Sequence, residues 1–265
     1  MKNKFLLLGL SFFILSCSSD DDSGNAESQM DFFLLADNNF WVYDVENSTP
    51  GTNGTDSLYI AGDVTIAGNT YKKFETENPP YGFYSGIVSN NAVRKSGDEL
   101  LLTGTAAVGF YDDFAFELEL TDYTVFKESA GNNDVFASLT GSFEEVYDQY
   151  SIVFDYTLTS TGKDMMASYS VNGTTYTNVK PIDIKLELEV SAVVNFQGFE
   201  VPVTVMAPQN VLVSTQYYAE SIGVVHVVTD FEYELEDLSQ YPVQVPFEQS
   251  VQIHQEEFLT NYSAD

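Results

Sequence analysis

Residues 182–196 read IDIKLELEVSAVVNF, and this stretch decides the fold class. Every even-numbered residue in it is apolar, whereas Val193 is the only apolar residue at an odd position. An alternation with a period of two is typical of a β-strand with one buried face. At about 3.3 Å per residue, the strand would be roughly 50 Å long. Because a ribbon of that length twists and coils, we expect it to bend across two layers or to curl around a core.

Other alternating segments lie on both sides of this strand, at 114–120, 150–158 and 211–218. The 17 Tyr and 20 Phe residues also favour strands. We therefore predict an all-β fold of about fourteen strands and no helix. Its long twisted antiparallel strands would form an open or closed barrel-like meander, similar to a lipocalin-like or LolA-like half-barrel. A β-sandwich is the alternative.

Two local patterns refine this prediction. The stretch from Phe83 to Val88 resumes the apolar alternation after a Pro-rich break, so we expect another strand there. Pro242 precedes the last apolar stretch, residues 243–253, and Pro246 lies within it. Proline is confined to edge strands or strand ends, so this last strand is expected at the edge of the sheet.

The chain contains one short internal repeat. IAGNTY at 66–71 and VNGTTY at 171–176 share their Gly, Thr and Tyr, 105 residues apart. A duplication would divide the β domain, residues 31–265, into two similar halves with a boundary near 160–168. The other interpretation is that hairpins with a glycine turn resemble one another.

The N-terminus has the features of a secretory signal. Lys2 and Lys4 precede eleven apolar or small residues, 5–15, too few for a membrane-spanning helix, which needs about 20. Ile14-Leu15-Ser16 before Cys17 resembles the lipobox of bacterial lipoproteins. The resemblance implies cleavage of residues 1–16 and lipid on Cys17. As the single cysteine of the chain, Cys17 has no disulfide partner.

The segment after Cys17 is polar and acidic. Ser18, Ser19, Asp20, Asp21 and Asp22 resemble the signal that sends lipoproteins of Bacteroidetes-type bacteria to the outer cell surface. Residues 17–30 would then be a lipidated tether of an outer-membrane protein that faces the cell exterior. A flexible linker has the same composition, which leaves retention on the inner leaflet as the alternative.

Two further motifs carry a family resemblance. NFWVY at 39–43 and YYAESIGVV at 217–225 look like the opening and closing motifs of uncharacterised Bacteroidetes-type surface lipoproteins. The resemblance extends over residues 38–235 and implies no catalytic residues. Ser221 stands where the closing motif often has glycine.

The chain is strongly acidic, with 40 Asp and Glu against 10 Lys and Arg and a net charge of −30. Such a surface repels nucleic acid, so we expect no nucleic-acid partner. It attracts divalent cations or basic partners, although adaptation to a salty habitat would produce the same composition.

Residues that usually carry chemistry are scarce. The segment 82–86 does not have the spacing of a nucleophile elbow. We expect His226 to be a partly exposed strand residue and His254 to lie in a solvated loop. Without a His or Cys cluster, a transition-metal site is not expected, and no cofactor is predicted. Calcium has candidate ligands by type, but not by spacing, in Asn132, Asn133, Asp134, Asp112 and Asp113.

These observations favour a protein that binds rather than catalyses. We expect a hydrophobic, glycan or protein ligand, because small-molecule sites are often apolar hollows in barrel mouths, and a membrane contact through the lipid on Cys17. Two alternatives remain. One is a carbohydrate hydrolase with paired carboxylates, and the other is a structural component of the envelope without a pocket.

Overall fold

The computed structural model describes residues 31–264 except 112–113, 148–149, 197–198, 242–244 and 246–247. This part of the chain contains thirteen strands and one short helix. In chain order they are β1 (Phe40–Asn47), β2 (Gly54–Ile66), β3 (Asn69–Thr76), α1 (Phe83–Ser89), β4 (Ala92–Ser96), β5 (Glu99–Tyr111), β6 (Phe114–Lys127), β7 (Val135–Tyr147), β8 (Tyr150–Gly162), β9 (Met166–Val171), β10 (Thr174–Phe196), β11 (Phe199–Ala219), β12 (Gly223–Glu234) and β13 (Ser250–Ser263).

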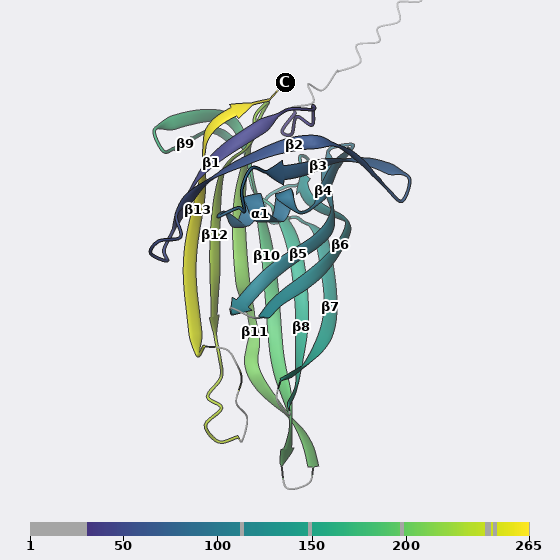
Figure 1. The fold of residues 1–265 in the computed structure, drawn as a ribbon, viewed down its shortest axis with the longest axis vertical. Helices are drawn as coiled ribbons and strands as arrows, with labels where there is room; N and C mark the ends of the chain where they lie inside the picture. The colour runs from purple at the N-terminus through teal and green to yellow at the C-terminus, as the bar shows by residue number, and fades with distance from the viewer. Residues whose placement is uncertain are drawn as a thin grey trace, which may run out of the picture.

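All strands belong to one antiparallel sheet. Its order is β6-β5-β4-β3-β2-β1-β13-β12-β11-β10-β8-β7, and β9 pairs with β10 beside this path. The sheet curls until its two end strands, β6 and β7, come near each other, and α1 lies inside the curl (Figure 1). The prediction of an all-β, barrel-like meander is confirmed, and the single sheet leaves no place for a sandwich of two stacked sheets.

The strand predicted at 182–196 is the C-terminal part of β10, which is 23 residues long. It pairs with β11 on one side and β8 on the other. Three register shifts occur along the pairing with β11, between Leu186 and Ser191. Such bulges bend a strand, which allows this long ribbon to curve around the core. Leu186 and Leu188 on its inner face are fully buried.

The prediction of a strand from Phe83 to Val88 is wrong, because these residues form α1. The helix has no side-chain cap of its own. Its first backbone N–H groups are instead bonded by Gln255 and Glu257 of β13, which is distant in sequence. Tertiary contacts therefore override the local alternation, as they often do in short segments.

The expectation of an edge position for the last strand is also wrong. Pro242 and Pro246 precede β13, which begins at Ser250. β13 therefore carries no proline, and it pairs with β1 on one side and β12 on the other. The strands at the two ends of the sheet order are β6 and β7, and β9 pairs with β10 alone.

The two motifs that carry the family resemblance meet in space. Trp41 Nε1 donates a hydrogen bond of 2.6 Å to the carbonyl of Ile222, and the Tyr43 hydroxyl donates one of 2.8 Å to the carbonyl of Val224. Ser221, in the turn before β12, has a φ of 60°. Glycine adopts that value more readily than serine does.

The two hairpins of the internal repeat, β2–β3 and β9–β10, are confirmed. Ala67 and Gly68 in one turn, and Asn172 and Gly173 in the other, all have positive φ, as a type I′ turn requires. A duplication of two halves stays a prediction. The sheet continues across the proposed boundary through the pairing of β8 with β10.

Candidate functional site

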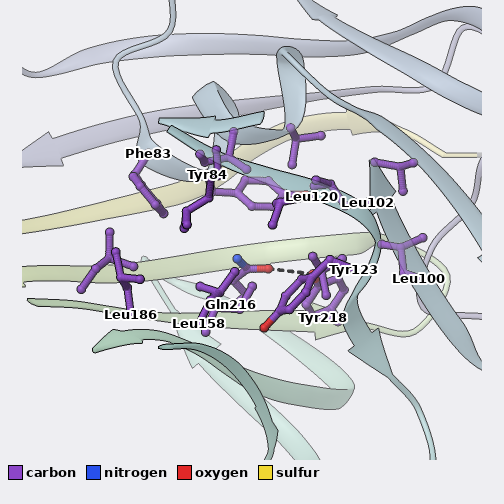
Figure 2. A pocket seen from close by; sticks show the side chains of 18 of the residues that line it. Phe83, Tyr84, Leu100, Leu102, Leu120, Tyr123, Leu158, Leu186, Gln216 and Tyr218 are labelled. Carbon is purple, nitrogen blue, oxygen red and sulfur yellow. Dashed lines mark hydrogen bonds between the residues drawn. The ribbon is translucent and has the colours of Figure 1, made fainter. Parts of the chain in front are cut away.

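An apolar cavity lies inside the curl, between α1, the β5–β6 hairpin and the inner faces of β8, β10 and β11 (Figure 2). Its volume is about 60 Å³, on a scale on which one water needs roughly 10–15 Å³. Apart from Gln216 and three tyrosines, the described lining is aliphatic or phenylalanine. It consists of Phe33, Phe83, Tyr84, Ile87, Val88, Val93, Leu100, Leu102, Ala106, Leu118, Leu120, Tyr123, Val125, Leu158, Ile184, Leu186, Leu212, Gln216 and Tyr218.

A second hollow of about 250 Å³ adjoins the cavity and is more open. We call it the mouth. Phe83 and Leu212 line both spaces, so the Phe83 ring stands at their boundary. The remaining lining of the mouth mixes apolar and polar side chains, namely Asn47, Ala107, Thr229, Phe231, Ile253 and Gln255. A molecule that enters the cavity from this side must pass Phe83.

The roof of the cavity is α1, which Glu257 holds in place. One carboxylate oxygen accepts a bond of 2.7 Å from the backbone N–H of Tyr84, and the other accepts bonds from the backbone N–H (3.2 Å) and the hydroxyl (2.7 Å) of Ser85. Glu257 is fully buried, and this desolvation raises its pKa to about 7 although the hydrogen bonds oppose the shift. A Cβ on Gly82 would lie 2.1 Å from Glu257 Oε2, so the close approach requires glycine.

Two more side chains hold the segment before the helix. Asp56 of β2 accepts hydrogen bonds from the backbone N–H groups of Tyr81 (2.9 Å) and Gly82 (2.7 Å). Gln255 of β13 accepts one from the backbone N–H of Phe83 at 2.6 Å and donates one to the Tyr81 carbonyl at 3.1 Å. The roof is therefore attached to two strands that pair with β1 from opposite sides.

Opposite the roof, the lining carries the polar side chains Gln216, Tyr218 and Tyr123 (Figure 2). Gln216 on β11 is only 6% exposed, and its Oε1 accepts a hydrogen bond of 2.7 Å from the hydroxyl of Tyr218. Burial raises the pKa of Tyr218, and it raises that of Tyr123 to about 12. The Tyr123 hydroxyl accepts a bond of 3.1 Å from the hydroxyl of the buried Ser160. Both phenols are therefore neutral hydrogen-bonding groups at ordinary pH.

Both histidines lie on the outer face of the sheet. His226 lies in a strand, β12, as expected, but its expected partial exposure is wrong, and so is the expectation of a loop at His254. His226 is buried, with 3% of its surface exposed, because Tyr217 and Phe258 stack beside it and Tyr169 of β9 covers it. His254 lies in β13 rather than in a loop.

Glu256 joins the two rings. It contacts His226 Nε2 at 2.9 Å and His254 Nε2 at 3.3 Å, while Asp230 contacts His254 Nδ1 at 2.7 Å. Burial lowers the pKa of His226, whereas the hydrogen bond to Asp230 raises that of His254. This chain of contacts is a surface network that does not touch the cavity lining.

Among the other residues named from the sequence, those that the structure describes do not line the cavity. Cys17, the run from Ser18 to Asp22, and the calcium candidates Asp112 and Asp113 lie outside the described residues. Asp134 accepts a hydrogen bond of 2.7 Å from the Gly131 backbone and so stabilises a turn.

In the part of the chain that the structure describes, no three His, Cys, Asp or Glu side chains are arranged to hold a metal ion. The same residues include no helix long and apolar enough to cross a membrane.

Sequence reasoning missed Gln216, although a signal for it exists. Leu212, Ser214, Gln216 and Tyr218 share one parity in β11 and face inward, so Gln216 places an amide within a buried row. Comparison with known proteins adds no assignment, since no family model, no curated protein and no solved structure matches this chain. Functional inference therefore rests on the geometry of the cavity.

Proposed function

We propose that this protein binds a slim apolar molecule inside the curled sheet. The observation that carries the proposal is the cavity itself, which is lined by aliphatic and aromatic side chains in a chain of net charge −30. Pockets of this kind, mostly apolar with a few placed polar groups, are the usual form of small-molecule sites.

The size of the cavity limits the ligand. An engineered apolar cavity of about 150 Å³ holds benzene, whereas the inner cavity measures about 60 Å³. The end of a hydrocarbon chain fits this space better than a ring does. The rest of the chain would lie in the mouth, beyond Phe83, where about 250 Å³ is free.

A glycan needs many polar partners, but the polar side chains among the described lining residues are Gln216 and the three tyrosines. The lining therefore favours a hydrophobic ligand over a glycan. It does not favour a hydrolase either. The carboxylates of Asp56 and Glu257 beside α1 are both engaged with backbone N–H groups.

Binding is tested with the purified full-length chain and N-phenyl-1-naphthylamine, a neutral fluorophore that brightens in apolar sites and whose rings have room in the mouth of about 250 Å³. We expect saturable fluorescence that medium-length alkyl compounds displace. Ala106→Leu adds three carbons inside the cavity and should weaken displacement by alkyl chains at least tenfold. Ala167→Leu, the same change at an exposed position of β9, should have no effect. If the unchanged protein shows no saturable binding, the proposal fails.

We further propose that lipid on Cys17 anchors the protein to the outer membrane and that it faces the cell exterior. The lipobox-like residues before Cys17 and the acidic run after it support this proposal. Cys17→Ala should abolish incorporation of a labelled fatty acid and release the protein from membranes. Digestion of the unchanged protein by protease added to intact cells would support the outward orientation, and full protection would contradict it.

A further inference from the structure

We propose that Gln216 recognises a neutral oxygen acceptor on the bound molecule. The ligand class would then be an apolar chain with a carbonyl near its inner end, as in a ketone or an ester, rather than a plain hydrocarbon or a fatty acid. This inference rests on the proposed function and specifies its ligand.

The side chain of Gln216 has one end bonded and the other end free to meet a ligand. Its Oε1 is occupied by the Tyr218 hydroxyl at 2.7 Å, so Nε2 points the other way, into the cavity (Figure 2). A primary amide carries two N–H donors on that nitrogen. Within the described residues, the side chain of Gln216 makes no hydrogen bond besides the one with Tyr218. A side chain that is 6% exposed thus directs donors into an apolar space.

The orientation of this amide is fixed by its neighbour. The ring of Tyr218 is fully buried and packs against Phe126 and Phe33, at centroid distances of 4.4 and 6.0 Å. A ring held in this way keeps its hydroxyl on Gln216 Oε1. Tyr218 is therefore a positioning residue for the Gln216 donors.

A buried donor without a partner is unfavourable, and the cavity is large enough for a few waters that would satisfy it. A ligand that displaces such a water must replace its hydrogen bond or lose affinity. A ketone or ester oxygen replaces that bond, whereas a hydrocarbon of the same length does not. The amide should therefore discriminate between the two.

The ligand oxygen should be neutral. Among the described residues that line the cavity, none is Lys, Arg or His. A carboxylate would be buried there without a counter-charge, which is strongly unfavourable. The fully buried Glu257, which bonds the roof residue Tyr84, would add repulsion. Fatty acids are thus excluded at the inner end.

The test compares eight-carbon compounds as competitors of N-phenyl-1-naphthylamine on the full-length chain at pH 8. We expect 2-octanone to bind about tenfold more tightly than n-octane, and octanoate to bind most weakly. Gln216→Met, which keeps the length of the side chain, should remove the preference for the ketone, so that 2-octanone and octane compete with similar affinity. Gln252→Met, at an exposed position of β13, is the matched control and should keep the preference.

A second measurement does not depend on a variant. The infrared carbonyl stretch of bound 2-octanone should lie at lower wavenumber than in hexane, because the carbonyl accepts a hydrogen bond.

Tyr218→Phe tests the positioning role of Tyr218. It should reduce the preference for 2-octanone over octane to a few-fold, because the amide of Gln216 becomes free to rotate.

The outcomes are distinguishable. Equal binding of 2-octanone and octane, or a carbonyl stretch as in hexane, would overturn the role of Gln216 while the proposed binding function stands. Octanoate binding as tight as that of the ketone would overturn the requirement for a neutral oxygen. If none of the compounds nor the fluorophore binds, the proposed function itself fails.

Discussion

Glu256 and Glu257 are neighbours in β13, yet they serve opposite faces of the sheet. Side chains alternate along a strand, so Glu257 points inward and is fully buried, whereas the side chain of Glu256 is 32% exposed. Glu257 accepts three hydrogen bonds from the start of α1. Glu256 contacts the two histidine rings on the outside.

The difference shows how the curled sheet separates two tasks. On the inner face, water cannot replace a carboxylate as hydrogen-bond acceptor, because it cannot reach the N–H groups that the carboxylate bonds. On the outer face, solvent and salt screen each charge, so single contacts contribute little. The inner face should therefore be sensitive to substitution and the outer face tolerant.

The largest expected effect is the difference in stability between alanine variants of these two residues. Glu257→Ala leaves the buried donors of Tyr84 and Ser85 without an acceptor, and we expect a loss of about 3–5 kcal/mol in the free energy of unfolding. Glu256→Ala should cost less than about 1 kcal/mol. Urea unfolding curves of both variants measure the difference, and similar losses would refute the contrast between the faces.

The second effect is a pH dependence that originates at Glu257. Its pKa is about 7 in the folded state, above the ordinary value of 4.5 that applies when the chain is unfolded. The raised pKa favours the folded state fully below pH 4.5, and this contribution is lost as the pH rises through 7, by an amount on the order of 3 kcal/mol. Glu257→Gln should flatten the stability profile between pH 4.5 and 7. An unchanged profile in that variant would assign the slope to other groups.

The third effect is a difference in stability between alanine variants of two glycines, Gly82 just before α1 and Gly86 within it. A Cβ at Gly82 would clash with Glu257 Oε2, whereas at Gly86 its nearest neighbour is 3.6 Å away. Gly82→Ala should therefore cost about 1–3 kcal/mol through overpacking. Gly86→Ala lies within α1 and should stabilise by about 0.5–1 kcal/mol through helix propensity. Thermal unfolding of the two variants checks the signs, and two losses of equal size would argue against the close approach of Glu257.

The smallest effect belongs to the outer face. The lowered pKa of His226 contributes stability that is present above pH 6.5 and lost as the pH falls, whereas the raised pKa of His254 contributes stability that is present below pH 6.5 and lost as the pH rises through the folded-state pKa. His254→Gln should lower stability at pH 5.5 by less than about 0.5 kcal/mol, because this ring is half exposed. Chemical denaturation at pH 5.5 and 8 measures it. A loss above 1 kcal/mol would show that the outer network also holds the fold.

Sequence patterns were reliable wherever a long run of residues kept one periodicity. The alternation at 182–196 lies in β10, and the glycine turns at 68 and 173 lie in hairpins. They failed where the run was short. Phe83 to Val88 has a strand-like alternation, but buried acceptors from β13 make it a helix.

For the cavity, the sequence shows which residues face inward but not which strands face one another. That β11 faces inward at every second residue is visible in the sequence, and Gln216 stands in that inward row. Which strands it faces is not visible, because the lining comes from segments between Phe33 and Tyr218 that are far apart along the chain.

The amino-acid sequence alone predicted the all-β class, because period-two alternation is a local property of each strand, but it left a barrel-like curl and a sandwich as alternatives. The N-terminal signal and the lipidation of Cys17 remain predictions from local motifs. Tertiary structure decided the rest: that α1 exists, that His226 is buried, and that Gln216 points its donors into an apolar cavity. These features depend on which distant strands the curl brings together, and no local pattern records that pairing.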